Sequence, residues 1–117
     1  MTWFCMVCFA EVPPHAARCT ACGAPSDPER SYEQQLLAAL SHRLPDRRLL
    51  AAELLGRIRS RAAIPRLAEL ALDATDPYLQ AAAARALARI DADHPVLRRL
   101  AEHGPILARA ALRGGRR

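Results

Sequence analysis

Four cysteines, all within the first 22 residues, constrain the fold of this 117-residue chain more than any other feature. They form two Cys-x2-Cys pairs, Cys5 with Cys8 and Cys19 with Cys22, separated by a ten-residue loop. A loop of that length lets the chain fold back so that four sulfurs surround one ion. Because the chain does not start with a basic region followed by an apolar stretch, we expect a reducing, cytoplasmic setting, with the cysteines as ligands and not as disulfides.

The donor set predicts which metal is bound. Soft thiolates in a tetrahedral arrangement select zinc, with iron in a rubredoxin-like site as the alternative. Four protein ligands leave no open position for water, so the site is expected to hold one structural zinc ion through Cys5, Cys8, Cys19 and Cys22. His15, in the loop between the pairs, is the less favoured replacement ligand. A segment of about 25 residues buries too little apolar surface to fold alone, so the metal should supply its folding energy.

Residues 3–25 resemble the short bacterial zinc-ribbon family. That family commonly has proline after the first cysteine of each pair and glycine after the second. Gly23 follows the second pair and suits a turn with positive φ. Met6 and Thr20 stand in place of the prolines, and Phe9 stands in place of the first glycine. The first turn is therefore expected to leave less space for a side chain than the second, or to differ from it in shape.

Composition changes near residue 25, where the cysteine-containing part gives way to a remainder rich in Ala, Leu and Arg. The change predicts a zinc ribbon over residues 1–25, a linker over residues 26–30 and a helical domain over residues 31–117. In the helical part, Ser31 with Gln34 forms a capping box, and prolines mark later starts. The expected helices run over residues 31–42, 45–58, 60–72 and 77–90, then from about 93 and from about 105 onward.

Similarity at a fixed spacing relates these helices to one another. Pro45 and Leu55 recur 32 residues later as Pro77 and Leu87, and Pro65 recurs 30 residues later as Pro95. A period of this length is typical of a solenoid, in which each unit buries its apolar face against its neighbours. The alternative is that Ala-rich amphipathic helices resemble one another by chance. Six helices with short connections predict about three antiparallel hairpins.

Residues 48–58, 63–67 and 76–87 are similar to the bacterial HEAT-like repeat, of the type also seen in phycobilisome lyases. The similarity extends over roughly residues 45–113. It implies a stacked-helix surface, but the array is too short for the lyase function, and no lyase residue is carried over. The predicted fold class is therefore mainly α: a short α-solenoid of about three HEAT-like helical hairpins with a small N-terminal zinc ribbon.

No motif predicts an enzyme or a small-molecule substrate, because neither a phosphate-binding loop nor a nucleophile elbow is present, and no apolar run is long enough to span a membrane. The remaining histidines, His42, His94 and His103, fall at predicted helix ends, where a cation suits the helix dipole. The predicted function is a protein–protein interaction adaptor or a small accessory subunit of a larger assembly.

Nucleic-acid binding is the alternative function. Residues 31–117 carry fifteen arginines against nine acidic residues, which gives this part a basic balance. Residues 1–30 are slightly acidic, however, and the chain has no lysine and no aromatic stripe on which bases would stack. Protein binding is therefore favoured.

The repeat spacing also predicts where a partner binds. In HEAT-like arrays the second helix of each hairpin lines the concave face, and the offsets bring arginines to equivalent positions there. Such a row suits bidentate contacts with carboxylates, so the expected partner is a protein with an acidic surface. The alternative is a solvated stripe of amphipathic helices. The predicted partner-binding residues are Arg57, Arg85, Arg89, Arg109 and Arg113.

Overall fold

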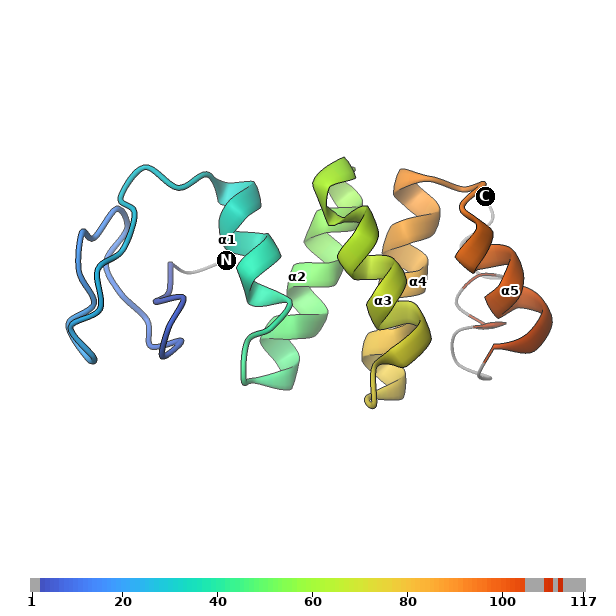
Figure 1. The fold of residues 1–117 in the computed structure, drawn as a ribbon, viewed down its shortest axis with the longest axis horizontal. Helices are drawn as coiled ribbons and strands as arrows, with labels where there is room; N and C mark the ends of the chain where they lie inside the picture. The colour runs from blue at the N-terminus through green and yellow to red at the C-terminus, as the bar shows by residue number, and fades with distance from the viewer. Residues whose placement is uncertain (1–2, 105–108, 111, 113–117) are drawn as a thin grey trace.

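The structure, a computed structural model, describes residues 3–104, 109–110 and 112, and its helices form one elongated row (Figure 1). The helices are α1 (Tyr32–Ala39), α2 (Pro45–Arg57), the 3-10 helix η1 (Arg61–Ala63), α3 (Ile64–Asp73), α4 (Pro77–Ile90) and α5 (Pro95–His103). α1 and α3 lie in front of α2 and α4, and α5 follows at the far end. The four-cysteine segment (residues 3–30) lies beyond α1. This arrangement confirms the predicted mainly α fold and short solenoid.

Local signals set the helix starts as the sequence predicts. The Ser31 hydroxyl accepts a hydrogen bond from the Gln34 amide at 3.1 Å, and the Gln34 side chain accepts one from the Ser31 amide at 2.8 Å. This reciprocal capping box satisfies two amides that have no partner within α1. Pro45 and Pro77 occupy the first positions of α2 and α4, where a missing N–H costs nothing.

Two other starts differ from the prediction. Ser60 precedes the 3-10 helix and makes no side-chain cap bond, so α3 begins at Ile64. The cap of α5 is His94, one residue beyond the expected Asp93, and its Nδ1 accepts from the Val96 amide at 3.2 Å. His94 lies at the start of α5, where the helix dipole does not favour a cation, so the helix-dipole interpretation is wrong for His94.

The sixth expected helix, from about residue 105, lies mostly outside the described residues. Arg109, Ala110 and Leu112 within it are helical. Leu112 packs against the main apolar core. The third hairpin is therefore described in its first helix and in these few positions of its second.

Alanine and leucine side chains fill the core between the two rows of helices. Leu55 of α2 and Leu87 of α4, which are equivalent in the repeat, are both fully buried. At Gly56 an added Cβ would lie 2.8 Å from the Cα of Ala86 and 2.9 Å from its Cβ. α2 and α4 therefore approach each other too closely at this point for any side chain to replace the glycine hydrogen.

Candidate metal centre

The four cysteine sulfurs converge on one point. All four Sγ atoms lie within 4.8 Å of one another, and all four cysteines are free thiols. The Sγ atoms of Cys5 and Cys22 are 3.7 Å apart, as are those of Cys8 and Cys19. Zinc with four Zn–S bonds of about 2.3 Å requires sulfurs separated by about 3.8 Å. The donor set and its spacing therefore fit a tetrahedral metal ion.

Two turns of the same construction present these sulfurs: knuckle 1 (residues 4–11) and knuckle 2 (residues 18–25). In knuckle 1 the amide of Phe9 donates to the Cys5 carbonyl at 2.9 Å, and in knuckle 2 the amide of Gly23 donates to the Cys19 carbonyl at 3.0 Å. An isolated antiparallel bridge closes each turn, between residues 4 and 11 and between residues 18 and 25. The two knuckles thus repeat at an offset of fourteen residues.

Of the two alternatives for knuckle 1, the one that gives it a different shape is wrong. Phe9 has a φ of 63° and Gly23 a φ of 76°, so both residues adopt the left-handed conformation. A residue with a Cβ is strained there, at a cost of about 1–3 kcal/mol, whereas glycine is not. The backbone of knuckle 1 therefore follows the same path as that of knuckle 2 at an energetic cost.

Backbone amides prepare two of the sulfurs to be thiolates. The amide of Cys8, and then that of Val7, lower the pKa of Cys5 to about 6 against the effect of burial. The amides of Cys22 and Ala21 lower the pKa of Cys19 in the same way. Amides that point at sulfur favour its charged form, which is the form that binds a metal.

Cys22 behaves differently from these two residues. The amide of Ala24 lowers its pKa, but desolvation and the three neighbouring sulfurs outweigh that effect and raise the pKa to about 11. Four thiolates cannot share this small volume without a cation to offset their charge. Metal binding must therefore displace a proton, and it should tighten as the pH rises.

Knuckle 1 is the part of the metal centre that meets the helices. Phe4 is only 3% exposed and belongs to the same apolar core as Leu36 of α1 and Leu40, which caps the end of α1. The buried ring of His42, in the α1–α2 connection, lies 5.2 Å from the Phe4 ring and 4.9 Å from the Phe9 ring. Figure 1 shows knuckle 1, in darker blue, between α1 and knuckle 2.

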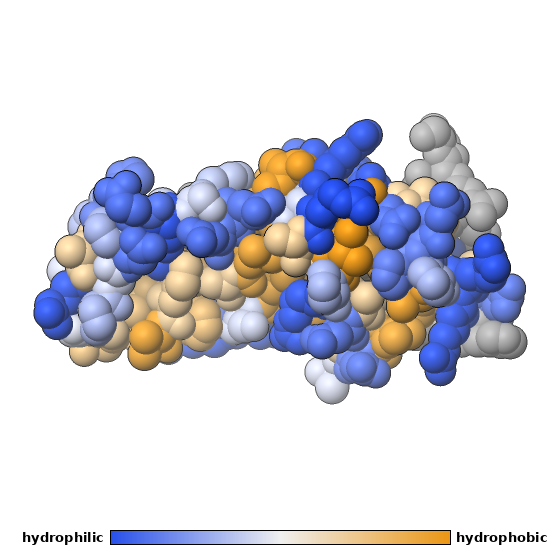
Figure 2. All heavy atoms as spheres, turned by 45° about the horizontal axis from the view of Figure 1, so that its top comes forward, coloured by the Kyte–Doolittle hydropathy of each residue, from blue (hydrophilic) through white to orange (hydrophobic). Residues whose placement is uncertain are grey.

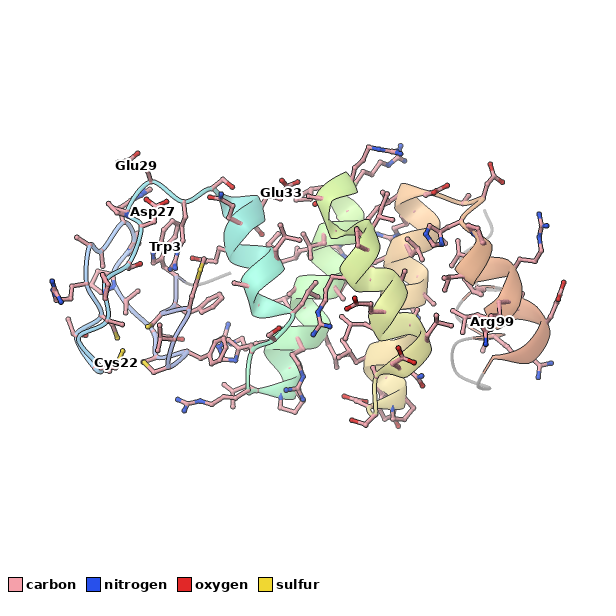
Figure 3. The ribbon with its side chains drawn as sticks, viewed as in Figure 1. Trp3, Cys22, Asp27, Glu29, Glu33 and Arg99 are labelled. Atoms are coloured by element: carbon pink, nitrogen blue, oxygen red, sulfur yellow. The ribbon has the colours of Figure 1, made fainter. Side chains whose placement is uncertain are left out.

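Arg30 and an ion pair complete this junction. Arg30, within the predicted linker, is buried, and its guanidinium lies 4.4 Å from the centre of the Trp3 ring and donates to the Phe4 carbonyl. Arg47 of α2 pairs with Glu11 of knuckle 1 at 3.3 Å. Figure 3 shows Trp3 on the α1 side of the segment and Cys22 farther from α1.

Sequence reasoning missed the roles of Arg30 and His42. The one sequence signal at Arg30 is its position directly before the capping box. A buried arginine there would need hydrogen-bond acceptors or an aromatic ring nearby. Burial lowers the pKa of His42, and the neighbouring charges of Arg47, Arg43 and Arg48 act in the same direction. His42 therefore acts as a neutral acceptor for the Leu44 amide at 3.1 Å, and not as a cation at the end of α1.

The predicted arginine row divides into three parts. Arg85 and Arg89 are exposed on α4 and, with Glu53, Ala82 and Ala86, line a shallow depression between α2 and α4. Arg57, on α2, is instead paired with Glu53 at 2.8 Å. Arg109 is exposed and helical, and Arg113 lies outside the described residues.

Comparisons with known proteins identify the helical part. No helix among the described residues is long and apolar enough to cross a membrane. No curated protein and no solved structure matches the chain. Residues 33–114 match the family described as HEAT repeats, and this region includes α2 to α5, with their repeated proline starts and buried leucines, and all of α1 except its first residue. The chain therefore belongs to the HEAT repeat family.

Proposed function

We propose that this chain is a non-enzymatic adaptor, or a small accessory subunit of a larger assembly, that binds a protein partner through the second helices of its HEAT hairpins. In this proposal Cys5, Cys8, Cys19 and Cys22 hold one structural zinc ion, and the protein acts in the cytoplasm, where thiols stay reduced. The family supports the first part, because HEAT repeats suggest a protein-interaction surface.

The observation that carries the proposal is the state of the arginines on α4. Among the described residues, no acidic side chain pairs with Arg85 or Arg89, although both are exposed and both border the depression between α2 and α4. They are one helical turn apart, so their guanidinium groups project from the same side of α4. Two adjacent guanidinium groups suit a pair of carboxylates on a partner.

The surroundings of this pair support a polar, acidic partner surface. Arg57 on α2 already bonds to Glu53, so it contributes less free positive charge than Arg85 and Arg89. The face drawn in Figure 2, seen with the top of Figure 1 turned forward, carries hydrophilic side chains along its length with hydrophobic residues between them. Tyr78, one of the exposed hydrophobic residues, is 65% exposed at the start of α4 and offers an aromatic contact on the same helix.

The test is capture of the partner from the native host by the tagged full-length chain, with and without nuclease. Replacing Arg85 and Arg89 together by Glu should abolish capture while metal content and thermal stability stay nearly unchanged. Replacing Arg98 and Arg99 of α5 by Glu is the matched control, because both are exposed and the change in charge is the same. The control should keep the partner.

Three outcomes contradict the proposal. If the Arg85/Arg89 variant keeps its partner at high salt, the α4 surface is not the binding site. If both double variants lose the partner equally, net charge matters and position does not. If the captured material disappears after nuclease treatment, the chain binds nucleic acid, and the alternative function replaces the adaptor.

A further inference from the structure

The two knuckles have the same backbone but different surroundings. Phe4 and Phe9 flank the sulfur ligands of knuckle 1, and Arg18 and Gly23 occupy the equivalent positions of knuckle 2. Phe4 is buried and Phe9 is partly buried against the main core, whereas Arg18 and Gly23 are exposed. Within the described residues, only knuckle 1 makes aromatic contacts with the helices.

Phe9 shows that these contacts compensate for strain. Its left-handed backbone would be more stable with glycine, as at residue 23 of knuckle 2. The Phe9 ring lies 4.9 Å from the His42 ring and 6.0 Å from the Phe4 ring. The ring therefore contributes packing against the helices that glycine could not provide.

The sulfur ligands fix the position of both rings. Cys5 directly follows Phe4, and Cys8 directly precedes Phe9, so a metal ion held by these two sulfurs determines where the two rings lie. Without the ion, a turn of this size has too few apolar contacts to hold that geometry. The Phe4 and Phe9 rings would then occupy their seat, the contact site in the apolar core beside α1, only part of the time.

This seat lies at the end of the helical stack. α1 is the first helix of the array, and its Leu36, together with Leu40 just after it, is buried in the same core as Phe4. In a solenoid each repeat is stabilised by its neighbours, so the terminal repeat needs a cap on its outer apolar face. Knuckle 1 occupies the place that a preceding repeat would take.

We propose that the metal centre is the N-terminal cap of the HEAT stack, so that zinc occupancy controls the stability of α1 and α2 in addition to that of the four-cysteine segment. The link is thermodynamic. Zinc binds the folded knuckle and not the unfolded one, so everything packed on the folded knuckle is stabilised along with it. The proposal does not depend on the identity of any partner.

The experiment follows the thermal melting of the helical circular dichroism signal in the full-length chain, loaded with zinc or stripped by a chelator. Removing zinc should lower the melting temperature of the helices by roughly 10 °C or more. Phe9→Gly removes the ring but relieves the strained backbone, so this variant should still bind one zinc ion. Its helices should melt earlier than those of the wild type. Chelation should lower their melting temperature by less than in the wild type, because only Phe4 of the two rings is left to link the metal site to the stack.

Val7→Ala is the matched control, because Val7 lies on the same knuckle and is 67% exposed. It should behave as the wild type does with and without zinc. An unchanged melting temperature after zinc removal would overturn the proposal. So would a Phe9→Gly variant that responds to chelation as the wild type does, or one that no longer binds zinc, because the ring would then serve the metal site and not the stack.

Discussion

The four-cysteine segment and the helical stack are held together by different means. In the four-cysteine segment the buried apolar residues are few, namely Phe4, Cys5, Val12 and Cys19, and two isolated bridges pair its backbone. In the stack, alanine and leucine pack fully buried between helices whose backbone is satisfied internally. The stability of the four-cysteine segment therefore depends on the chemistry of four sulfurs, whereas the stability of the stack depends on how the volumes of its side chains fit together.

The largest expected effect comes from removing one of the four cysteine ligands. Cys19→Ser should reduce zinc content from about one ion per chain to near zero, because an incomplete thiolate set loses most of the binding free energy that folds such a site. Elemental analysis of protein purified in reducing buffer measures this change. Thr20→Ala, at the exposed neighbouring position, is the control and should keep its zinc. Full zinc content in Cys19→Ser would show that the fourth thiolate is dispensable.

The next substitution disturbs the packing between α2 and α4 and leaves the four cysteines unchanged. Gly56→Ala should destabilise the stack by about 1–3 kcal/mol, because the new methyl group would meet the backbone of Ala86. This cost exceeds the gain of about 1 kcal/mol that alanine offers inside a helix. Chemical denaturation gives the free energy of unfolding, and zinc content should not change.

The repeat supplies the control for Gly56→Ala. Ala88 is the equivalent residue in α4 and is partly buried against the core, so Ala88→Gly should cost the difference in helix propensity, about 1 kcal/mol, together with the contacts of one methyl group. If Gly56→Ala is instead more stable than the wild type, α2 and α4 can move apart without loss. The stack would then be less tightly packed than the structure shows.

A smaller effect is expected where the two regions join. Ser31→Ala removes one half of the capping box of α1 and should cost about 1 kcal/mol of the free energy of unfolding. Ser41→Ala, at an exposed position just after α1, should have little effect. Equal effects of the two substitutions would show that the start of α1 is fixed by the packing of Arg30 and knuckle 1, and not by its cap.

The last prediction uses pH to separate the junction from the metal site. The pKa of His42 is lowered by burial, so in the window between its folded pKa and 6.5 the unfolded chain binds more protons than the folded chain. The contribution of His42 to stability is therefore complete well above pH 6.5 and is lost as the pH falls through that window. The nearby arginines 43, 47 and 48 act in the same direction.

His42→Asn tests this pH dependence. The asparagine side chain keeps an acceptor for the Leu44 amide but does not titrate. The free energy of unfolding should fall less steeply below pH 6.5 in this variant than in the wild type. Acid also weakens metal binding by the four thiolates, and this effect should be the same in both proteins. Identical pH profiles would show that His42 does not titrate in this range.

The sequence predicts those parts of the fold that local chemistry determines. Ser31, Pro45, Pro77 and Pro95 lie at the helix starts because capping and the fixed φ of proline act within one turn. The convergence of the four cysteines follows the spacing of the two pairs in the same way. The family match covers the helical array that the repeated prolines indicate.

The parts that could not be predicted depend on contacts between distant residues. Single-residue preferences oppose the left-handed conformation of Phe9, which the knuckle turn requires, and the packing of its ring against Phe4 and His42 compensates for the strain. Arg30 has the sequence context of a linker, and its burial under Trp3 depends on the path of knuckle 1. The close contact of Gly56 with Ala86 depends on how two helices cross.

The position of Trp3 gives the molecule an optical label for one of its two regions. Trp3 is the only tryptophan in the chain, and it lies in the four-cysteine segment against Arg30 and against the His15 ring, 5.0 Å away. Both tyrosines, Tyr32 and Tyr78, belong to helices. Indole emission excited selectively therefore reports on the segment alone, while far-ultraviolet ellipticity reports mainly on the helices. Recording both signals in one titration reveals whether the two regions unfold in one transition or in two.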